Sequence, residues 1–186
     1  LTRPFVPAGD RAYIQDFALY LPPPEDFVPI DRLVWGIRKS GMFSESAVLF
    51  MEKVLRNAGL AEKTALTKTI INMKVPGYKP TVQEAIDETG DIAEAVVGDL
   101  LKKTGVQPSE VDAVITACSC FSPTPSIASL VVNKFRLRSD CLTFSLGGMG
   151  CATSVVCADL AARLLRTMKP GAKVLIFNTE NLTNSW

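Results

Sequence analysis

The sequence predicts an α/β protein whose mainly parallel sheet is covered by helices on both faces. From about Pro76 onward, segments with helical spacing alternate with short apolar or β-branched segments that are typical of buried strands. Strands separated by helices need crossover connections, which bring successive strands together in parallel. We therefore expect an N-terminal strand, loop and helix region over residues 1–75 and a βαβ core over residues 76–186.

The first helix of the core is expected to begin after Thr81 and to end at Gly105. Thr81 and Glu84 form a capping box, in which the Thr81 hydroxyl accepts from the Glu84 N–H while the Glu84 side chain reaches back. Gly105 suits the left-handed position that commonly follows the last turn of a helix. The apolar residues with helical spacing between these ends are Val82, Ile86, Ala93, Val96, Val97, Leu100 and Leu101.

The later core elements are expected in the order strand, helix, strand, helix and strand, over Val111–Ala117, Ser126–Phe135, Cys141–Leu146, Cys151–Thr167 and Lys173–Phe177. In the last helix, Val156, Leu160 and Leu164 share one face. Asp159 and Arg163 have the spacing of an i,i+4 ion pair on another face.

The first 75 residues are less regular. Tyr13–Leu21 alternates enough to predict a strand, which three consecutive prolines would end. Ser44–Ala58 has the pattern of a helix closed by Gly59, and Glu25–Phe43 is expected to be loop with a short helix.

Composition excludes several classes of function. The chain has 186 residues, 47% of them hydrophobic, which is enough for one substantial core. Its 20 basic and 19 acidic residues are mixed without a basic block, so nucleic-acid binding has no electrostatic support. No apolar run approaches the roughly 18–20 residues that span a bilayer. Neither end has the pattern of a signal peptide or a natural stop, and we expect a fragment.

The five cysteines are Cys118, Cys120, Cys141, Cys151 and Cys157. Their odd number and apolar surroundings favour reduced thiols over a disulfide framework. Cys118-x-Cys120 lacks a second ligand pair, and the chain has no histidine, so we expect no metal site. Packing in the core is the favoured interpretation of this pair, with a place beside Cys151 as the alternative. Cys141 and Cys157 are interpreted as structural.

The segment Gly147-Gly-Met-Gly-Cys151 joins a predicted strand to a predicted helix. Its glycines allow a sharp turn and a close approach of substrate, and the N-terminus of the helix favours a thiolate. We therefore predict that Cys151 is a nucleophile for acyl transfer, against the alternative of a small buried hydrophobe. The usual basic partner of such a cysteine is missing, because the chain has no histidine.

Cys151 is expected at the edge of the sheet where the carboxyl ends of the parallel strands meet, which we call the rim. Two other segments are expected on the same rim. Phe121–Pro125 is either a stiff loop or a wall of the pocket. Asn178–Asn181 carries polar groups that either orient a substrate or cap the strand. Glycine-rich phosphate loops of the GxGxxG and GxxxxGK[ST] types are absent from the sequence, and no cofactor is expected.

These motifs together resemble the nucleophile region of plant and algal 3-ketoacyl-CoA synthases, the condensing enzymes of very-long-chain fatty-acid elongation, which are related to type III polyketide synthases. The resemblance covers nearly the whole chain. It is carried by Asp16–Ala18 with Tyr20, Leu101–Gly105, Phe121–Ser126, Asn133–Arg138, Phe144–Cys151 and Thr179–Asn181.

The resemblance implies the thiolase fold, built from two similar halves with a five-stranded sheet in each, of which this chain would be the N-terminal half. It implies that Cys151 takes an acyl group from acyl-CoA, after which malonyl-CoA loses CO2 and attacks the acyl-enzyme. The histidine and asparagine that assist would come from the C-terminal half. This chain alone is expected to be inactive and poorly soluble, because half of a thiolase core leaves an apolar face uncovered. The resemblance assigns no substrate-binding residue, cofactor or metal.

The resemblance also implies a homodimer, contact with other elongase subunits, and a place on the cytosolic face of the endoplasmic reticulum membrane through anchors outside this chain. Two departures from the family pattern, Ser119-Cys120 and Ala152–Ser154, are expected to change pocket width rather than chemistry. A soluble type III polyketide synthase, or another condensing enzyme of this fold, is the alternative among enzymes. A noncatalytic binding subunit is the alternative of another class.

Overall fold

The computed structural model describes residues 12–61, 63–67 and 79–184. Contacts between residues divide the chain into two units, one of Leu1–Tyr20 with Thr89–Asn181 and one of Leu21–Glu88 with Leu182–Trp186. The division at residues 75 and 76 that the sequence suggested stays a prediction. No helix within the described ranges is long and apolar enough to cross a membrane.

The larger unit contains a parallel sheet of three strands in the order β4-β3-β5. Its central strand is β3 (Val111–Ala117), which pairs with β4 (Leu142–Leu146) and β5 (Lys173–Asn178). Every residue of β3 is buried, as its run of β-branched and small residues predicts. The parallel sheet is therefore confirmed, with three strands among the described residues where the resemblance implies five.

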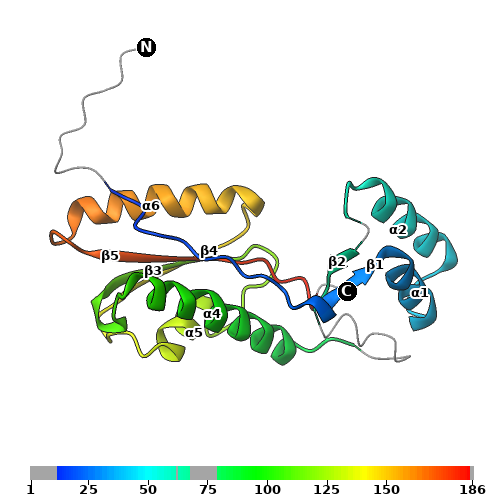
Figure 1. Cartoon of the computed structure of the whole chain (residues 1–186), viewed down its shortest axis with the longest axis horizontal. Helices are drawn as coiled ribbons and strands as arrows, with labels where there is room; N and C mark the ends of the chain where they lie inside the picture. The colour runs from blue at the N-terminus through cyan, green and yellow to red at the C-terminus, as the bar shows by residue number, and fades with distance from the viewer. Residues whose placement is uncertain (1–11, 62, 68–78, 185–186) are drawn as a thin grey trace, which may run out of the picture. The chain divides into compact units, whose positions relative to one another are not determined.

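Helices cover both faces of this sheet (Figure 1). The helix α6 (Thr153–Thr167) lies on one face, and α4 (Val82–Thr104) and α5 (Ile127–Lys134) lie on the other. On the α6 side, Cys157 and Ala161 pack against Ile115 and Ala117 of β3. The small side chains of Cys157 and Ala161 form the centre of the buried face of the helix, with the larger leucines at its margins.

The three residues that the sequence places on one face of α6 differ in their burial. Leu160 and Leu164 pack at the edge of this core. Val156, however, is 40% exposed, because the helix is rotated so that the adjacent Cys157 points to the sheet. The expected pair of Asp159 and Arg163 is present, with Arg163 Nε 2.7 Å from Asp159 Oδ2.

The capping box of Thr81 with Glu84 and the stop at Gly105 are confirmed, and Ser126 supplies a further cap. At the start of α4, the Glu84 N–H donates to the Thr81 hydroxyl, and the Thr81 N–H donates to the Glu84 carboxylate at 2.7 Å. At the start of α5, the Ser126 hydroxyl accepts from the Ser129 N–H. Gly105 follows α4 with a φ of 69°. These caps satisfy backbone groups that the helix itself leaves free.

A buried carboxylate, Asp112, joins β3 to the segments around it at the amino end of the sheet. Its side chain accepts from the Lys173 N–H at 3.0 Å and from Lys169 Nζ at 2.8 Å, and Arg138 Nη1 lies 3.2 Å away. Burial raises the pKa of Asp112, but the hydrogen bonds from Lys169 and the Lys173 N–H, and the charges of Lys169 and Arg138, lower it by more. The net result is a pKa below the ordinary value of 3.8.

We expect Asp112→Asn to lower the free energy of unfolding by about 1–3 kcal/mol at neutral pH, because charge-assisted hydrogen bonds to a buried group are lost. The carboxylate is more acidic folded than unfolded, so its contribution is present above 3.8 and is lost as the pH falls through the lowered folded value. Urea titrations at several pH values measure this. The exposed Glu110→Gln is the control, and a gap between wild type and Asp112→Asn that widens in acid contradicts the account.

The smaller unit is a helical hairpin on a short two-stranded sheet. The strands β1 (Phe27–Pro29) and β2 (Lys63–Ala65) pair antiparallel. The helices α1 (Ile30–Ser40) and α2 (Glu45–Asn57) follow β1. The helix predicted over Ser44–Ala58 is thus confirmed, and the Ser44 side chain caps its start by accepting from the Ala47 N–H. A separate core is formed by Val28, Leu33, Val34, Ile37 and Val48.

The strand predicted over Tyr13–Leu21 is wrong. This segment has no regular secondary structure, and Tyr13, Ile14 and Leu19 are 76%, 87% and 75% exposed. It is held instead by Lys103, whose Nζ donates to Asp16 Oδ1 at 2.7 Å and to the Phe17 carbonyl at 3.1 Å. An alternating pattern makes a strand only where a neighbouring strand offers its backbone, and none of the described strands pairs with this segment.

Candidate active site

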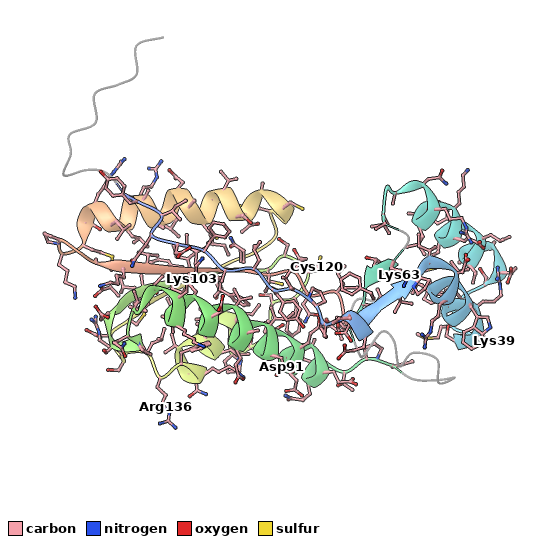
Figure 2. All side chains as sticks on the ribbon, in the orientation of Figure 1. Lys39, Lys63, Asp91, Lys103, Cys120 and Arg136 are labelled. Carbon is pink, nitrogen blue, oxygen red and sulfur yellow. The ribbon has the colours of Figure 1, made fainter. Side chains whose placement is uncertain are left out.

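Three loops meet at the carboxyl end of the parallel sheet, one from each strand. They are Cys118–Cys120 after β3, Gly147–Cys151 after β4 and Thr179–Asn181 after β5. The Cys118 N–H donates to the Leu146 carbonyl and the Thr179 N–H donates to the Ala117 carbonyl, so backbone pairing continues past the strand ends. Figure 2 shows Cys120 on this rim, beyond the ends of the strands. The predicted common rim is therefore present.

Cys151 is exposed on this rim. It lies in a single turn of 3-10 helix, Gly150–Ala152, and α6 begins two residues later than the sequence predicted, at Thr153. The buried Thr153 hydroxyl donates to the Gly150 carbonyl at 2.7 Å and so fixes this turn to the start of α6. The alternative that Cys151 is a buried hydrophobe is thus excluded.

Two of the glycines before Cys151, Gly147 and Gly150, are required for different structural reasons. At Gly147, a Cβ atom would lie 3.0 Å from the Cys118 carbonyl oxygen, so a side chain there would push β4 away from the end of β3. At Gly150 the constraint is conformational, because its φ of +59° is in the left-handed region.

Glu180 is the centre of the hydrogen bonding on the rim. Its Oε1 accepts from the Cys120 N–H at 2.7 Å, the Ser119 N–H at 3.0 Å and the Cys118 thiol at 3.2 Å. Partial removal from water raises the pKa of this carboxyl, but these hydrogen bonds lower it by more, so the pKa of Glu180 lies below its ordinary value. The sequence placed Glu180 on the rim but did not predict these partners.

Ser119 links this loop to the turn that carries the thiol. Its hydroxyl oxygen accepts from the Gly150 N–H at 3.0 Å. The family pattern led us to expect only an effect of Ser119 on pocket width, because no local pattern connects two residues 31 positions apart. Ser119 is the functional candidate that sequence reasoning missed.

The remaining predicted residues have mixed outcomes. Cys157 is buried against the sheet, as expected for a structural residue, and Cys141 is half-buried. Core packing holds for Cys118 but is wrong for Cys120, which is exposed. Asn181 is buried and its side chain donates to the Thr89 hydroxyl at 3.0 Å, which favours the structural interpretation of this residue.

Burial separates the five thiols into two groups. Burial raises the pKa of Cys141 and Cys157, and it also raises the pKa of Cys118, where the adjacent Glu180 carboxylate adds to it. Cys120 and Cys151 are the two exposed thiols. Exposure and thiolate formation both govern reactivity toward alkylating reagents.

We therefore expect iodoacetamide to label Cys120 and Cys151 at least about tenfold faster than the other three cysteines in the folded protein. Peptide mass spectrometry after short labelling times measures each site, and labelling in urea provides the control in which the difference disappears. Labelling of Cys157 as fast as that of Cys151 without urea contradicts this assignment of the exposed thiols.

A metal site has no support among the residues that the structure describes, since no three or more histidine, cysteine, aspartate or glutamate side chains gather suitably there. What the rim offers is an exposed thiol, anchored backbone turns and one ionised carboxylate that accepts hydrogen bonds. This arrangement suits covalent attachment of a substrate to sulfur.

Comparison with known proteins identifies the family to which this chain belongs. The family model described as FAE1/Type III polyketide synthase-like protein matches residues 7–186. The chain belongs to this family. Among curated relatives, 3-ketoacyl-CoA synthase 2 of Arabidopsis thaliana is 34% identical over 176 residues, which cover 95% of this chain and 33% of the relative. 3-Ketoacyl-CoA synthase 6 of the same plant is 36% identical over 174 residues, covering 94% and 34%.

Two solved structures with low sequence identity to this chain share its fold. The tetrahydroxynaphthalene synthase of Streptomyces coelicolor, a type III polyketide synthase, has a TM-score of 0.67 at 17% identity and covers 88% of this chain and 46% of its own. CsyB in complex with CoA-SH has a TM-score of 0.69 at 18% identity, covering 85% and 44%. The thiolase-like fold and the family resemblance are thus confirmed. The chain spans about a third of the length of its curated relatives.

Proposed function

We propose that the complete gene product is a condensing enzyme that joins a long-chain acyl-CoA to malonyl-CoA and forms a 3-ketoacyl-CoA, CO2 and CoA. The observation that carries the proposal is the exposed Cys151 on a glycine turn at the carboxyl end of the parallel sheet, in a chain of the FAE1/type III polyketide synthase-like family. Curated relatives at 34% and 36% identity are named 3-ketoacyl-CoA synthases.

In the proposed mechanism, the Cys151 thiolate attacks the thioester carbonyl of acyl-CoA and CoA leaves as a thiolate, which gives an acyl-cysteine. Malonyl-CoA then loses CO2, and the resulting carbanion attacks the acyl carbonyl and expels the Cys151 thiolate. The chain has no histidine, so we propose that the residues assisting decarboxylation, a histidine and an asparagine, come from outside it.

A type III polyketide synthase is the second candidate, because the solved structures that share the fold include enzymes of this class. The two candidates differ in how many malonyl units enter one product. Incubation of the complete protein with a long-chain acyl-CoA and isotopically labelled malonyl-CoA tests this by mass spectrometry. A product extended by one two-carbon unit supports the 3-ketoacyl-CoA synthase, and repeated extension supports the polyketide synthase. Absence of both the product and acyl-Cys151 indicates a noncatalytic binding subunit.

We further propose that the complete protein acts as a homodimer with other elongase subunits, at the cytosolic face of the endoplasmic reticulum membrane through segments outside this chain. The family assignment is what supports this proposal. Fractionation of cells that express the complete protein, followed by cross-linking, tests it. Recovery of a monomer in the cytosol alone contradicts it.

A further inference from the structure

Gly150 is held at both of its peptide groups. Its N–H donates to the Ser119 hydroxyl at 3.0 Å, and its carbonyl accepts from the Thr153 hydroxyl at 2.7 Å. Gly150 is bonded directly to Cys151, so these two contacts determine where the turn presents the thiol. The Thr153 contact lies within the same turn and helix, whereas the Ser119 contact comes from the loop after another strand, β3.

Ser119 is in turn held by Glu180, a residue of the loop after the third strand, β5. The Ser119 N–H lies 3.0 Å from Oε1 and 3.3 Å from Oε2 of Glu180. The adjacent Cys120 N–H and the Cys118 thiol donate to the same carboxylate. A carboxylate that accepts from several donors of one short loop restricts the positions which that loop can take. The connection therefore runs from Glu180 through the loop Cys118–Cys120 and the Ser119 hydroxyl to Gly150.

We propose that Glu180 is a positioning residue for Cys151, acting through the loop Cys118–Cys120 and the hydrogen bond from the Gly150 N–H to the Ser119 hydroxyl. Glu180 itself donates and accepts nothing at Cys151 among the contacts described, so its effect is on the placement of the thiol. The acylation measurement below rests on the proposed function, because it assumes that Cys151 accepts an acyl group. The measurements of hydrogen exchange and of thiol alkylation do not need this assumption.

The test uses Glu180→Gln, Ser119→Ala and their double variant in the complete gene product. Glu180→Gln keeps the shape but removes the charge and replaces one acceptor by an NH2 group. We expect each single change to slow acylation of Cys151 by a long-chain acyl-CoA about tenfold with KM within about twofold, because misplacement affects the reacting geometry more than binding. Ser119→Thr, which keeps the hydroxyl, is expected to restore the rate to within about threefold of wild type.

The double variant tests whether Glu180 and Ser119 affect Cys151 through the same chain of contacts. We expect it to be within about twofold of the slower single variant, because two changes along the same connection do not add independently. Effects that multiply to about a hundredfold overturn the proposed connection. Glu110→Gln is the matched control, since Glu110 is an acceptor for the Gln107 N–H and Lys173 Nζ at the opposite end of the strands.

Hydrogen exchange separates positioning from a general loss of structure. In Glu180→Gln, the segment Gly147–Ala152 is expected to exchange about tenfold faster although the hydrogen bonds described for Glu180 go to Cys118–Cys120 instead, while β3 keeps its protection. Iodoacetamide labelling of Cys151 is expected to slow in the same variants. Wild-type exchange and labelling in Glu180→Gln overturn the inference and leave acyl transfer standing. No acylation of wild-type Cys151, with the exchange and labelling effects present, contradicts the proposed function and supports the positioning role.

Discussion

Replacement of Cys151 by alanine is expected to abolish acyl-enzyme formation and to lower condensation by at least about 10³-fold. The reason is that the exposed thiol is the atom to which the acyl group is proposed to be attached, and alanine offers no substitute. Measurement requires the complete gene product, a long-chain acyl-CoA and labelled malonyl-CoA, with the 3-ketoacyl-CoA quantified by mass spectrometry.

The matched control is Cys141→Ala. Cys141 is a half-buried thiol just before β4, at the opposite end of that strand from Cys151. Its loss is expected to leave condensation within about twofold of wild type. Condensation by Cys151→Ala at a rate near that of the control removes Cys151 from the mechanism.

The second large effect is expected for Gly150→Ala. An alanine at a φ of +59° costs about 1–2 kcal/mol, and the chain relieves this strain most easily by changing the turn that presents Cys151. We therefore expect acylation of Cys151 to fall by about 10- to 100-fold, because small displacements of a reacting group have large kinetic effects. Single-turnover acylation measures this directly.

Gly171→Ala is the control for the conformational strain itself. Gly171 has a φ of +79° and open space around its Cα, as Gly150 does, but it lies between α6 and β5 and away from the rim. Both variants should lose similar stability, while Gly150→Ala alone should lose acylation. Equal acylation by the two variants would show that the conformation of Gly150 does not position the thiol.

The elements that the sequence predicted well are those defined by neighbouring residues. The strand β3 was found with its observed bounds because all seven positions are apolar, small or β-branched apart from Asp112. The capping box of Thr81 and Glu84 was found because each residue satisfies the other within one helical turn. The glycine turn before Cys151 was found because its conformation depends on its own residues.

The errors arise where structure depends on partners far along the chain. Tyr13–Leu21 has the alternation of a strand but lacks a neighbouring strand among the described residues. The pairing of Phe27–Pro29 with Lys63–Ala65 was not predicted, because three-residue strands have too little periodicity to be recognised. Likewise, the hydrogen bonds of Glu180 join residues about 60 positions apart. They could not be predicted from the sequence, because they depend on how the ends of the three strands lie beside one another.

Some features of the rim are therefore determined by neighbouring residues, and others by the order of the strands in the sheet. Gly147–Cys151 specifies a turn and a thiol by itself. Its attachment to Ser119, and through Ser119 to Glu180, follows from the parallel order β4-β3-β5, which places the loops after these strands side by side.

The most direct test of the account is the mass of the peptide that contains Cys151 after brief incubation of the complete protein with a long-chain acyl-CoA alone. The account predicts that this peptide gains the mass of one acyl group in a hydroxylamine-sensitive linkage, and that later addition of malonyl-CoA removes it as 3-ketoacyl-CoA. A Cys151 peptide that stays unmodified, or an acyl group found on Cys120 instead, contradicts the account.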